Sequence, residues 1–533
     1  MTILAVFALL ATCSADAPVT HVTVRAGSTI ATVPPGIYSV GYCGWGDTSA
    51  PQAVAHLQAL GVKFCRIEVN LAHLCGDKPG DYRWDYTTPP DLGVGFVDRV
   101  KQLVANGWTP LLSISTSHAL PTWMHGEFRD ASKGPTWLSI APQSDQMTQI
   151  AHDLAAGMAS RGMKGLYYET IYELGIEMPL EDIHHVVALG LRAGDPTCKI
   201  VGPATWPGWS VQERFVKPYL TKYGADLLDL VSAHWYADNE HKFWDLPGWK
   251  ETQGIVTMAN HTMLDYLMET APKYSVWCRS LRKLLDDPTL NPKGKHIGLC
   301  FTEFDALATS PYERNPINPD WPNYRADADC YINTNYFGGV WSAYVLCDVA
   351  ASGCADAMFK FNARDYYGLI ENGKDKDFFR LPVWFAWKLL RDAGGLVPGA
   401  KMLATYVDGP NDAGATHLVD GADNPWVGAY AVKTARGMSL IVINRSQEAQ
   451  TVEADVRGLS AGAERKGKRY LFSADRVAKF IGRKPGTPND GAFEGAPDDS
   501  KSAPCLQPVG DVTLSPAGIH LTLPSLSMTI LAF

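Results

Sequence analysis

The sequence predicts an α/β protein in which a (β/α)8 TIM barrel is followed by a C-terminal antiparallel β-sandwich. Between residues 36 and 395, apolar strand segments alternate eight times with amphipathic helical segments, a pattern typical of a parallel sheet. Eight such units match a closed barrel with long loops, whereas doubly wound sheets more often have five or six strands and a Gly-rich nucleotide-binding turn. After residue 395 the helical periodicity stops and short alternating runs begin, as expected of a sandwich.

The elements of the barrel follow one another in regular order. The predicted strands cover 36–45, 62–69, 108–116, 166–173, 199–203, 228–236, 296–303 and 357–361. Apolar residues recur at helical spacing after each strand. The predicted helices cover 52–60, 96–107, 147–158, 181–193, 212–223, 261–285, 326–351 and 380–393.

The C-terminal region contains seven short runs with strand-like alternation. They cover 426–432, 438–444, 451–456, 469–473, 512–514, 519–523 and 528–533. A Pro-, Gly- and Asp-rich stretch at 484–508 predicts a flexible loop. An early strand precedes the barrel, and we expect it to join the sandwich. The predicted organisation is a signal peptide at 1–17, this strand at 18–35, the barrel at 36–395 and the sandwich at 396–533.

Composition restricts the classes of partner. The chain has 533 residues, a net charge of −9 and no block of Lys or Arg, so nucleic acid is not an expected partner. Aromatic residues make up 11% and include 16 Trp; such side chains can serve as core or as flat apolar platforms for sugar rings. The sequence specifies no oligomeric state.

The N-terminus has the features of an export signal. An apolar run at 3–11 is too short to span a bilayer, and Ala15-Asp16-Ala17 fits a small-residue cleavage site. The alternatives are a buried strand, or a lipoprotein attached through Cys13. We therefore expect a secreted or periplasmic protein without a membrane span.

Export permits disulfides between some of the 11 cysteines. Cys43 and Cys75 are close enough in sequence to pair across a loop, as are Cys347 and Cys354. The sequence has no CxxC pair or His/Cys cluster at zinc spacing, so we expect no metal site and no cofactor.

Acidic residues stand at the ends of two predicted strands. Strand seven ends at Glu303, and strand four runs through Glu173 toward Glu177. Barrel enzymes place catalysis at the carboxyl ends of their strands. Two carboxylates facing each other across a cleft are the minimum machinery for cleaving a glycosidic bond.

These acids make the chain resemble the retaining clan A glycoside hydrolases, especially families 39, 51, 30 and 79. Phe301-Thr302-Glu303-Phe304 is similar to the nucleophile strand of the clan, and the run 231–236 is similar to its strand six, with His234 and Tyr236 facing the site. Arg66 matches the strand-two arginine that binds the nucleophile. The segments at 367–370 and 384–387 resemble the last loop and helix of families 39 and 51. The resemblance covers the barrel and the sandwich.

The chain departs from the clan pattern before the acid/base residue. The clan has an Asn there that binds the sugar 2-hydroxyl, whereas Tyr172 precedes Glu173 and Ile176 precedes Glu177. Strand length favours Glu173 as the acid/base, because reaching Glu177 would take a strand of about twelve residues. The local sequence Leu-Gly-Ile-Glu-Met favours Glu177, because it resembles the Leu-Gly-Asn-Glu-Met of family 51. For Glu173 we expect burial beside Tyr172 to favour the protonated form.

Other side chains follow strand ends and are candidates for substrate binding. Arg66 has an alternative role as a partner of Glu68, which shares its face of the strand, and His234 has one as a buried core histidine. The full set of predicted substrate-binding residues is Arg66, His118, Trp123, His234, Tyr236, Trp45 and Trp206.

The function predicted from these residues is a secreted retaining glycoside hydrolase that acts on oligo- or polysaccharides by double displacement, with Glu303 as nucleophile. The first alternative is a catalytically degenerate carbohydrate-binding barrel, because the Asn is absent. The second is a metal-dependent hydrolase, although few His and Asp residues stand at strand ends.

Overall fold

The computed structural model describes most of the chain. The described residues are 19–41, 50–87, 94–115, 120–124, 144–173, 179–205, 210–237, 263–306, 333–364, 368–372, 378–410, 425–457, 464–483, 491–493, 498–515 and 518–533. No helix within these ranges is long and apolar enough to cross a membrane. The predicted signal peptide at 1–17 lies outside them.

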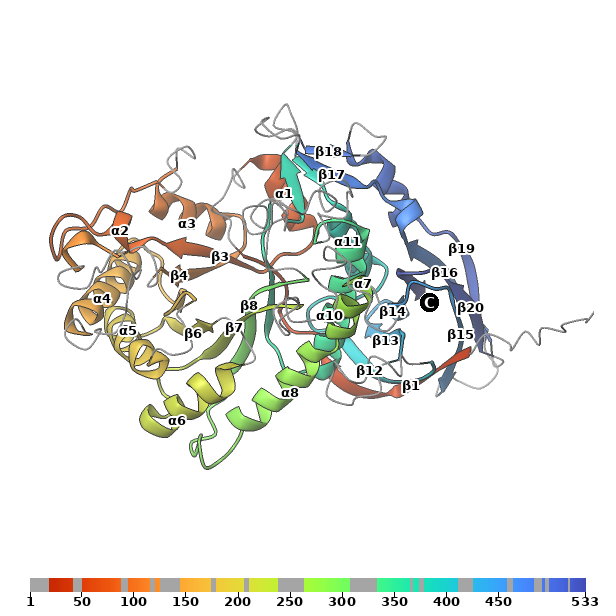
Figure 1. Cartoon of the computed structure of the whole chain (residues 1–533), viewed down its shortest axis with the longest axis horizontal. Coiled ribbons are helices and arrows are strands. Elements are labelled where there is room, and N and C mark those ends of the chain that lie inside the picture. Colours follow the sequence, from red (N-terminus) through yellow and green to blue (C-terminus); the bar gives the residue numbers. More distant parts are fainter. Residues whose placement is uncertain are drawn as a thin grey trace, which may run out of the picture.

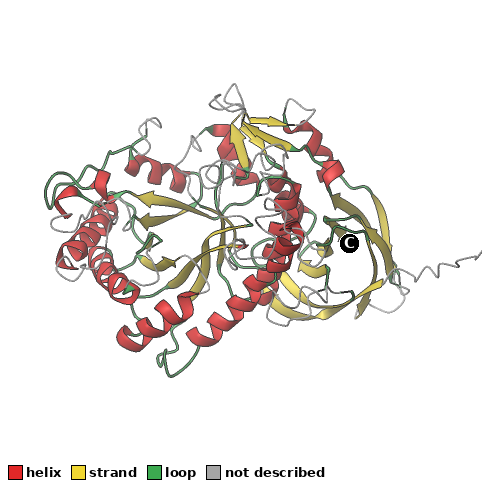
Figure 2. Ribbon diagram, in the orientation of Figure 1, coloured by secondary structure: helices red, strands yellow, loops and turns green. Residues whose placement is uncertain are grey.

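Eight parallel strands close into a barrel (Figure 1), and helices surround it (Figure 2). Each strand pairs with the next along the chain, and the last pairs with the first. The (β/α)8 barrel predicted from the sequence is therefore confirmed. Its strands are β2 (Gly36–Val40), β3 (Phe64–Val69), β4 (Thr109–Ile114), β5 (Tyr167–Glu169), β6 (Lys199–Thr205), β7 (Leu230–Tyr236), β8 (Gly298–Asp305) and β9 (Ala357–Lys360).

The barrel helices bury one apolar face each, as α5 does through Ile183, Val187 and Leu191. The helix predicted at 261–285 is instead two helices. Pro272 separates them, because its ring and missing N–H interrupt the helical hydrogen bonds. The helices are α1 (Pro51–Ala59), α2 (Leu71–Leu74), α3 (Phe96–Ala105), α4 (Ser144–Ser160), α5 (Leu180–Gly194), η6 (Gln212–Val216), α6 (Lys217–Tyr223), α7 (Met263–Thr270), α8 (Lys273–Leu285), α10 (Tyr336–Ser352) and α11 (Pro382–Asp392).

Helix α10 joins the two parts of the molecule. It contacts α8 and α11 of the barrel as well as β1 and β13 of the sandwich. Because both sides are covered, its residues are apolar all round rather than on one stripe. Gly353 ends the helix with a positive φ of 66°, a conformation that glycine adopts without a steric penalty.

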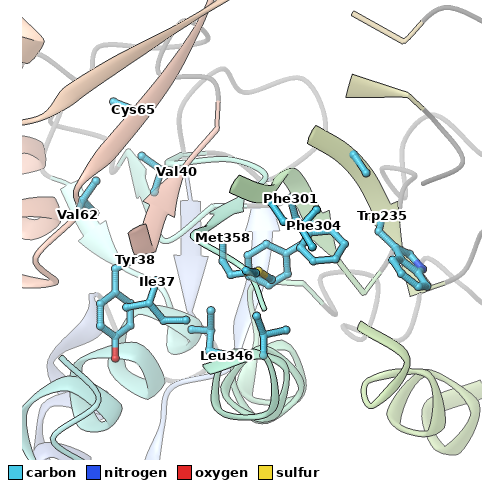
Figure 3. Close-up of a cluster of buried hydrophobic side chains, with 14 of the residues drawn as sticks. Ile37, Tyr38, Val40, Val62, Cys65, Trp235, Phe301, Phe304, Leu346 and Met358 are labelled. Carbon is cyan, nitrogen blue, oxygen red and sulfur yellow. The ribbon is translucent and has the colours of Figure 1, made fainter. Parts of the chain in front are cut away.

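Strand β8 packs phenylalanines into the core between barrel and helices and places Glu303 inside the barrel. Phe301 and Phe304 are fully buried, and Phe304 stacks on Trp387 of α11 at 6.4 Å between ring centroids. Figure 3 shows both phenylalanines grouped with Met358 near Leu346 of α10. An irregularity in the pairing with β9 between Phe301 and Phe304 lets both rings reach this core.

The second unit contains a nine-stranded sheet with the order β19-β16-β21-β14-β13-β12-β1-β15-β20. Every neighbouring pair is antiparallel except β1 and β15. The predicted C-terminal β-sandwich is confirmed. Its strands are β1 (Val19–Thr32), β12 (Lys401–Asp408), β13 (Val427–Thr434), β14 (Gly437–Asn444), β15 (Gln450–Arg457), β16 (Arg465–Phe472), β19 (Gly510–Leu514), β20 (Ile519–Leu523) and β21 (Ser527–Ala532).

Some elements were not predicted from the sequence. Strand β12 was missed because its alternation of buried and exposed residues is confined to its second half. Two short hairpins pair β10 (Ile370–Asn372) with β11 (Phe378–Arg380), and β17 (Phe480–Arg483) with β18 (Gly491–Phe493). The loop predicted at 484–508 contains β18 and the 3-10 helix η12 (Asp499–Leu506).

The cysteine pairs predicted from sequence proximity are wrong. Cys75, Cys347 and Cys354 are free thiols, whereas Cys65 is disulfide-bonded. Cys347 lies inside α10, about two helical turns or ~10 Å from Cys354, and a disulfide requires α-carbons within about 7 Å. Cys43 lies outside the described residues.

Candidate active site

Glu303 lies near the end of β8 with its carboxylate inside the barrel. The side chain is 2% exposed. Arg66 Nη1 donates to Oε1 at 2.6 Å, and the Tyr236 hydroxyl donates to Oε2 at 2.6 Å. An irregularity in the β7–β8 pairing places His234 directly opposite Glu303. Three neighbouring groups therefore hold this carboxylate in one orientation.

Arg66 of β3 is held between two carboxylates and is almost fully buried. Besides Glu303, its Nε donates to Glu169 Oε2 at 2.6 Å and its Nη2 to Ser113 Oγ at 2.9 Å. Ser113 Oγ in turn donates to Glu169 at 2.8 Å. The alternative partner Glu68 is therefore wrong, because the guanidinium points across the barrel rather than along its own strand.

Glu169 was not among the residues expected at the site. It lies on β5 and is fully buried, and it balances the charge that Arg66 brings into the barrel. A glutamate inside an otherwise apolar strand was the available signal, since buried charges are paired. The motif at 168–173 includes Glu169, but the resemblance to the clan points to its last residue, Glu173.

Glu173 follows β5 in a left-handed conformation, with φ of 46°. Its backbone N–H donates to Ala204 O at 3.1 Å. A positive φ in a residue other than glycine costs about 1–3 kcal/mol, and such residues gather at functional sites. The turn shortens β5 to Tyr167–Glu169, whereas the sequence predicted a strand over 166–173.

The two acids face each other across His234. His234 Nδ1 lies 2.7 Å from Glu173 Oε1 and 3.3 Å from Glu303 Oε2. The ligand atoms of the three residues all lie within 4.8 Å of one another. Carboxyl groups in retaining glycosidases are about 5–5.5 Å apart, so this spacing suits direct attack by one acid rather than activation of an intervening water.

Tyr172 forms a wall beside these groups. Its ring centroid lies 5.8 Å from that of His234 in an edge-on arrangement, and the Arg66 guanidinium carbon lies 5.0 Å from it. Burial raises the pKa of Tyr172, and the charges of Glu303 and Glu173 raise it further. The expected burial of Glu173 beside this ring is wrong, since 35% of the Glu173 side chain is exposed.

The buried acids differ in their protonation chemistry. Burial raises the pKa of Glu303 above its ordinary value, although His234, Arg66 and Tyr236 act in the opposite direction. Burial also acts to raise the pKa of Glu169, but the charge of Arg66 and the neighbouring hydrogen bonds outweigh it and lower that pKa. Glu169 is therefore the stable counter-ion, and Glu303 is the acid that titrates nearer to neutrality.

Glu173, His234 and Glu303 are also a possible set of ligands for a cation. Two carboxylates and an imidazole suit several divalent metals. However, Arg66 and Tyr236 already donate to the two oxygens of Glu303. A cation would have to compete with a buried guanidinium, so the donor set fits a metal poorly.

The remaining predicted residues are only partly placed. Trp123 lies on η2 (Thr122–Met124), and its Nε1 donates to Gly76 O at 3.1 Å. The indole packs against the hydrophobic core and joins the loops that follow two barrel strands. Four predicted residues lie outside the described residues: Trp45, His118, Glu177 and Trp206.

Comparisons with known proteins place this barrel and sandwich among solved structures. A family 51 α-L-arabinofuranosidase from Bifidobacterium longum is 16% identical, with a TM-score of 0.58 over 96% of this chain and 99% of that chain. The chain has the fold of the clan A glycoside hydrolases. A family 30 endoxylanase from Clostridium papyrosolvens is 12% identical, with a TM-score of 0.52 and the same coverage. No protein-family model and no curated protein matches the sequence.

A family 44 xyloglucanase from Paenibacillus polymyxa is similar to the same extent. It is 14% identical, with a TM-score of 0.53 over 96% of this chain and 99% of that chain. At these identities the likeness is one of fold. Within the clan A fold, strands four and seven correspond to β5 and β8, so Glu173 and Glu303 occupy the strand ends that the sequence resemblance named.

Proposed function

We propose that the protein is a secreted retaining glycoside hydrolase in which Glu303 is the nucleophile and Glu173 the acid/base. The observation that carries the proposal is the pair of acids from β5 and β8 meeting at His234, with ligand atoms within 4.8 Å. The fold adds support, because solved structures with this barrel and sandwich include glycosidases of families 51, 30 and 44.

The first step is attack by the Glu303 carboxylate on the anomeric carbon of the sugar. Arg66 and Tyr236 hold the carboxylate in place and stabilise its charge. Glu173 gives its proton to the departing oxygen, so the glycosidic bond breaks as the sugar–Glu303 ester forms. In the second step Glu173 takes a proton from water as the water oxygen attacks the anomeric carbon. The bond between the sugar and Glu303 breaks, the sugar leaves, and both acids return to their starting states.

The proposal is tested by hydrolysis of a panel of 4-nitrophenyl glycosides. The panel contains arabinofuranoside, xyloside, glucoside and glucuronide, which are all compatible with such a barrel. We expect release of nitrophenol from at least one of them. Binding of glycans without hydrolysis of any panel member or polysaccharide would instead support the carbohydrate-binding alternative. Two observations favour that alternative: His234 Nδ1 lies 2.7 Å from Glu173 Oε1, and Tyr172 stands where the clan has its Asn.

Glu173→Ala is expected to lower the rate with alkyl glycosides by about 10²–10⁴-fold, because their leaving oxygen needs a proton. Nitrophenyl glycosides need no such proton to form the ester, so the rate of ester formation from them should fall much less. Added azide, which attacks the ester without a general base, should restore turnover. The matched variant is Glu177→Ala. If Glu177→Ala shows this pattern and Glu173→Ala does not, the acid/base is assigned to the wrong glutamate.

The acidic limb of the pH profile of kcat/KM is expected above 4.5, the ordinary pKa of a glutamate, because burial raises the pKa of Glu303 and only its anion attacks. Tyr236→Phe removes a hydrogen bond that favours the anion, so the limb should move to higher pH. Tyr406→Phe is the control, since Tyr406 is 53% exposed on the sandwich. An unchanged limb in Tyr236→Phe would show that Glu303 does not control it.

A further inference from the structure

Three adjacent strands of the sandwich bring two histidines and a glutamate into one row. Strands β1, β15 and β20 are neighbours at one edge of the sheet (Figure 1). His21 pairs directly with Glu453, and Glu453 pairs directly with His520. Directly paired residues point to the same face of a sheet. Their neighbours Val22 and Val452 are buried, so the row lies on the outer, solvent-facing side.

The side chains of this row already approach one another. His21 Nδ1 lies 3.3 Å from Glu453 Oε2, and His520 Nδ1 lies 3.4 Å from Glu453 Oε1. Each imidazole therefore faces a different oxygen of one carboxylate. The three residues also line a hollow of about 390 Å³ on the sandwich surface, together with Thr23 and Asp455.

The two separations from Glu453 match the spacing of neighbouring ligands around a small divalent cation. Zinc binds nitrogen and carboxylate oxygen at about 2.0–2.2 Å, so neighbouring ligand atoms of a tetrahedral site lie about 3.3–3.5 Å apart. The imidazole side chains of His21 and His520 are 59% and 69% exposed. Both must rotate toward a shared ion, because the three donors do not lie within 4.8 Å of one another as the barrel donors do.

We propose that His21, Glu453 and His520 form a surface site for Zn²⁺ or a similar first-row divalent cation, with water completing the shell. Imidazole ligands favour such ions over Ca²⁺ and Mg²⁺, which prefer oxygen. The surrounding charge is favourable. Asp408 pairs with His21 from the other side, and Arg457, the nearest cation of the hollow, is paired with Asp455 at 2.8 Å.

This site would connect the N-terminal strand to the edge of the sandwich. Strand β1 lies between β12 and β15, and β20 is the last strand of the sheet. An ion bound to all three residues links β1, β15 and β20 in the folded state only. Binding to the folded state alone raises the temperature of unfolding. The site is separate from the barrel acids and does not depend on the proposed hydrolase activity.

The test is calorimetric titration of chelator-treated full-length protein with ZnCl₂ at pH 7.5. The protein carries Glu303→Gln, which removes a ligand from the three-donor group that the described residues hold within 4.8 Å inside the barrel. We expect one Zn²⁺ per chain and a higher Tm when zinc is present. His21→Ala and His520→Ala should each weaken binding at least about tenfold, since even outer partners of metal ligands contribute 10–100-fold. Affinity should fall at pH 5.5, because only neutral imidazoles bind metals.

His296→Ala is the matched control. His296 is also exposed, but it has a single carboxylate neighbour, Asp356, at 4.0 Å, so its loss should leave zinc binding unchanged. Circular dichroism checks that the variants remain folded. The proposal is overturned if the parent protein binds no zinc, or if the His21→Ala/His520→Ala double variant binds it as tightly. The row would then be only a set of cross-strand ion pairs.

Discussion

Replacing Glu303 with Gln is expected to lower turnover of any hydrolysed glycoside by at least about 10⁴-fold, because nucleophile loss removes the covalent route. The amide is nearly the same size as the carboxylate but is too weak a nucleophile to form the sugar ester. Arg66 retains Glu169 as a counter-ion at 2.6 Å, so the fold should survive. The measurement is kcat for parent and variant on the same nitrophenyl glycoside, with circular dichroism as the check on folding.

The control for this variant is Glu181→Gln. Glu181 lies in the first turn of α5, on the outside of the barrel, and its replacement removes the same charge without touching the site. We expect its kcat to stay within about twofold of the parent, as for most surface substitutions. Undiminished hydrolysis by Glu303→Gln would eliminate Glu303 as the nucleophile.

Arg66→Met is expected to destabilise the protein by about 3–5 kcal/mol, the usual cost of removing one partner from a buried ion pair. Both Glu169 and Glu303 are almost fully buried and accept hydrogen bonds from this guanidinium. Without it, two carboxylates share the barrel interior, and no other Lys or Arg of the described residues forms an ion pair with either of them. The measurement is the free energy of unfolding from urea denaturation of parent and variant at pH 7.

The destabilisation should depend on pH with a defined sign. In the parent, Arg66 keeps the pKa of Glu169 below its ordinary value, so this stabilisation is present above pH 4.5 and is lost as the pH falls. In Arg66→Met, burial is opposed only by His234 and the remaining hydrogen bonds. We therefore expect the carboxylate pKa values to rise and stability to fall as the pH rises. The difference between the two proteins should therefore be largest near neutral pH and shrink toward pH 4.

Arg465→Met serves as the comparison for Arg66→Met. Arg465 is exposed at the start of β16, and we expect a change within about 0.5 kcal/mol. A loss of less than about 1 kcal/mol in Arg66→Met would be typical of an exposed ion pair. That result would contradict the buried arrangement of Arg66, Glu169 and Glu303.

The barrel could be predicted because its signals are local. Period-two and period-3.6 patterns of apolar residues mark strands and helices one at a time, and the number of units implies a closed ring. Glu303 stood out for the same reason, as an acid at the end of an apolar strand. The break at Pro272 between α7 and α8 and the strand β12 were missed, because the pattern of apolar residues there was ambiguous.

The interior of the site could not be read from local patterns. Arg66 on β3 contacts Glu169 on β5, with β4 between the two strands. The sequence does not specify which residues of neighbouring strands lie opposite one another. The exposure of Glu173 depends on a single backbone angle, φ of 46°, that no neighbouring residue type predicts. The row of His21, Glu453 and His520 also depends on the register between β1, β15 and β20, which the chain separates by long stretches of sequence.

The central claim is that the acids of β5 and β8 act by double displacement, and the anomeric configuration of the first product tests it most directly. Proton NMR of the reaction with a hydrolysed panel glycoside identifies the anomer before mutarotation mixes the two forms. Two successive displacements at the anomeric carbon predict a product with the configuration of the substrate. A product that first appears with the opposite configuration would contradict the covalent role of Glu303.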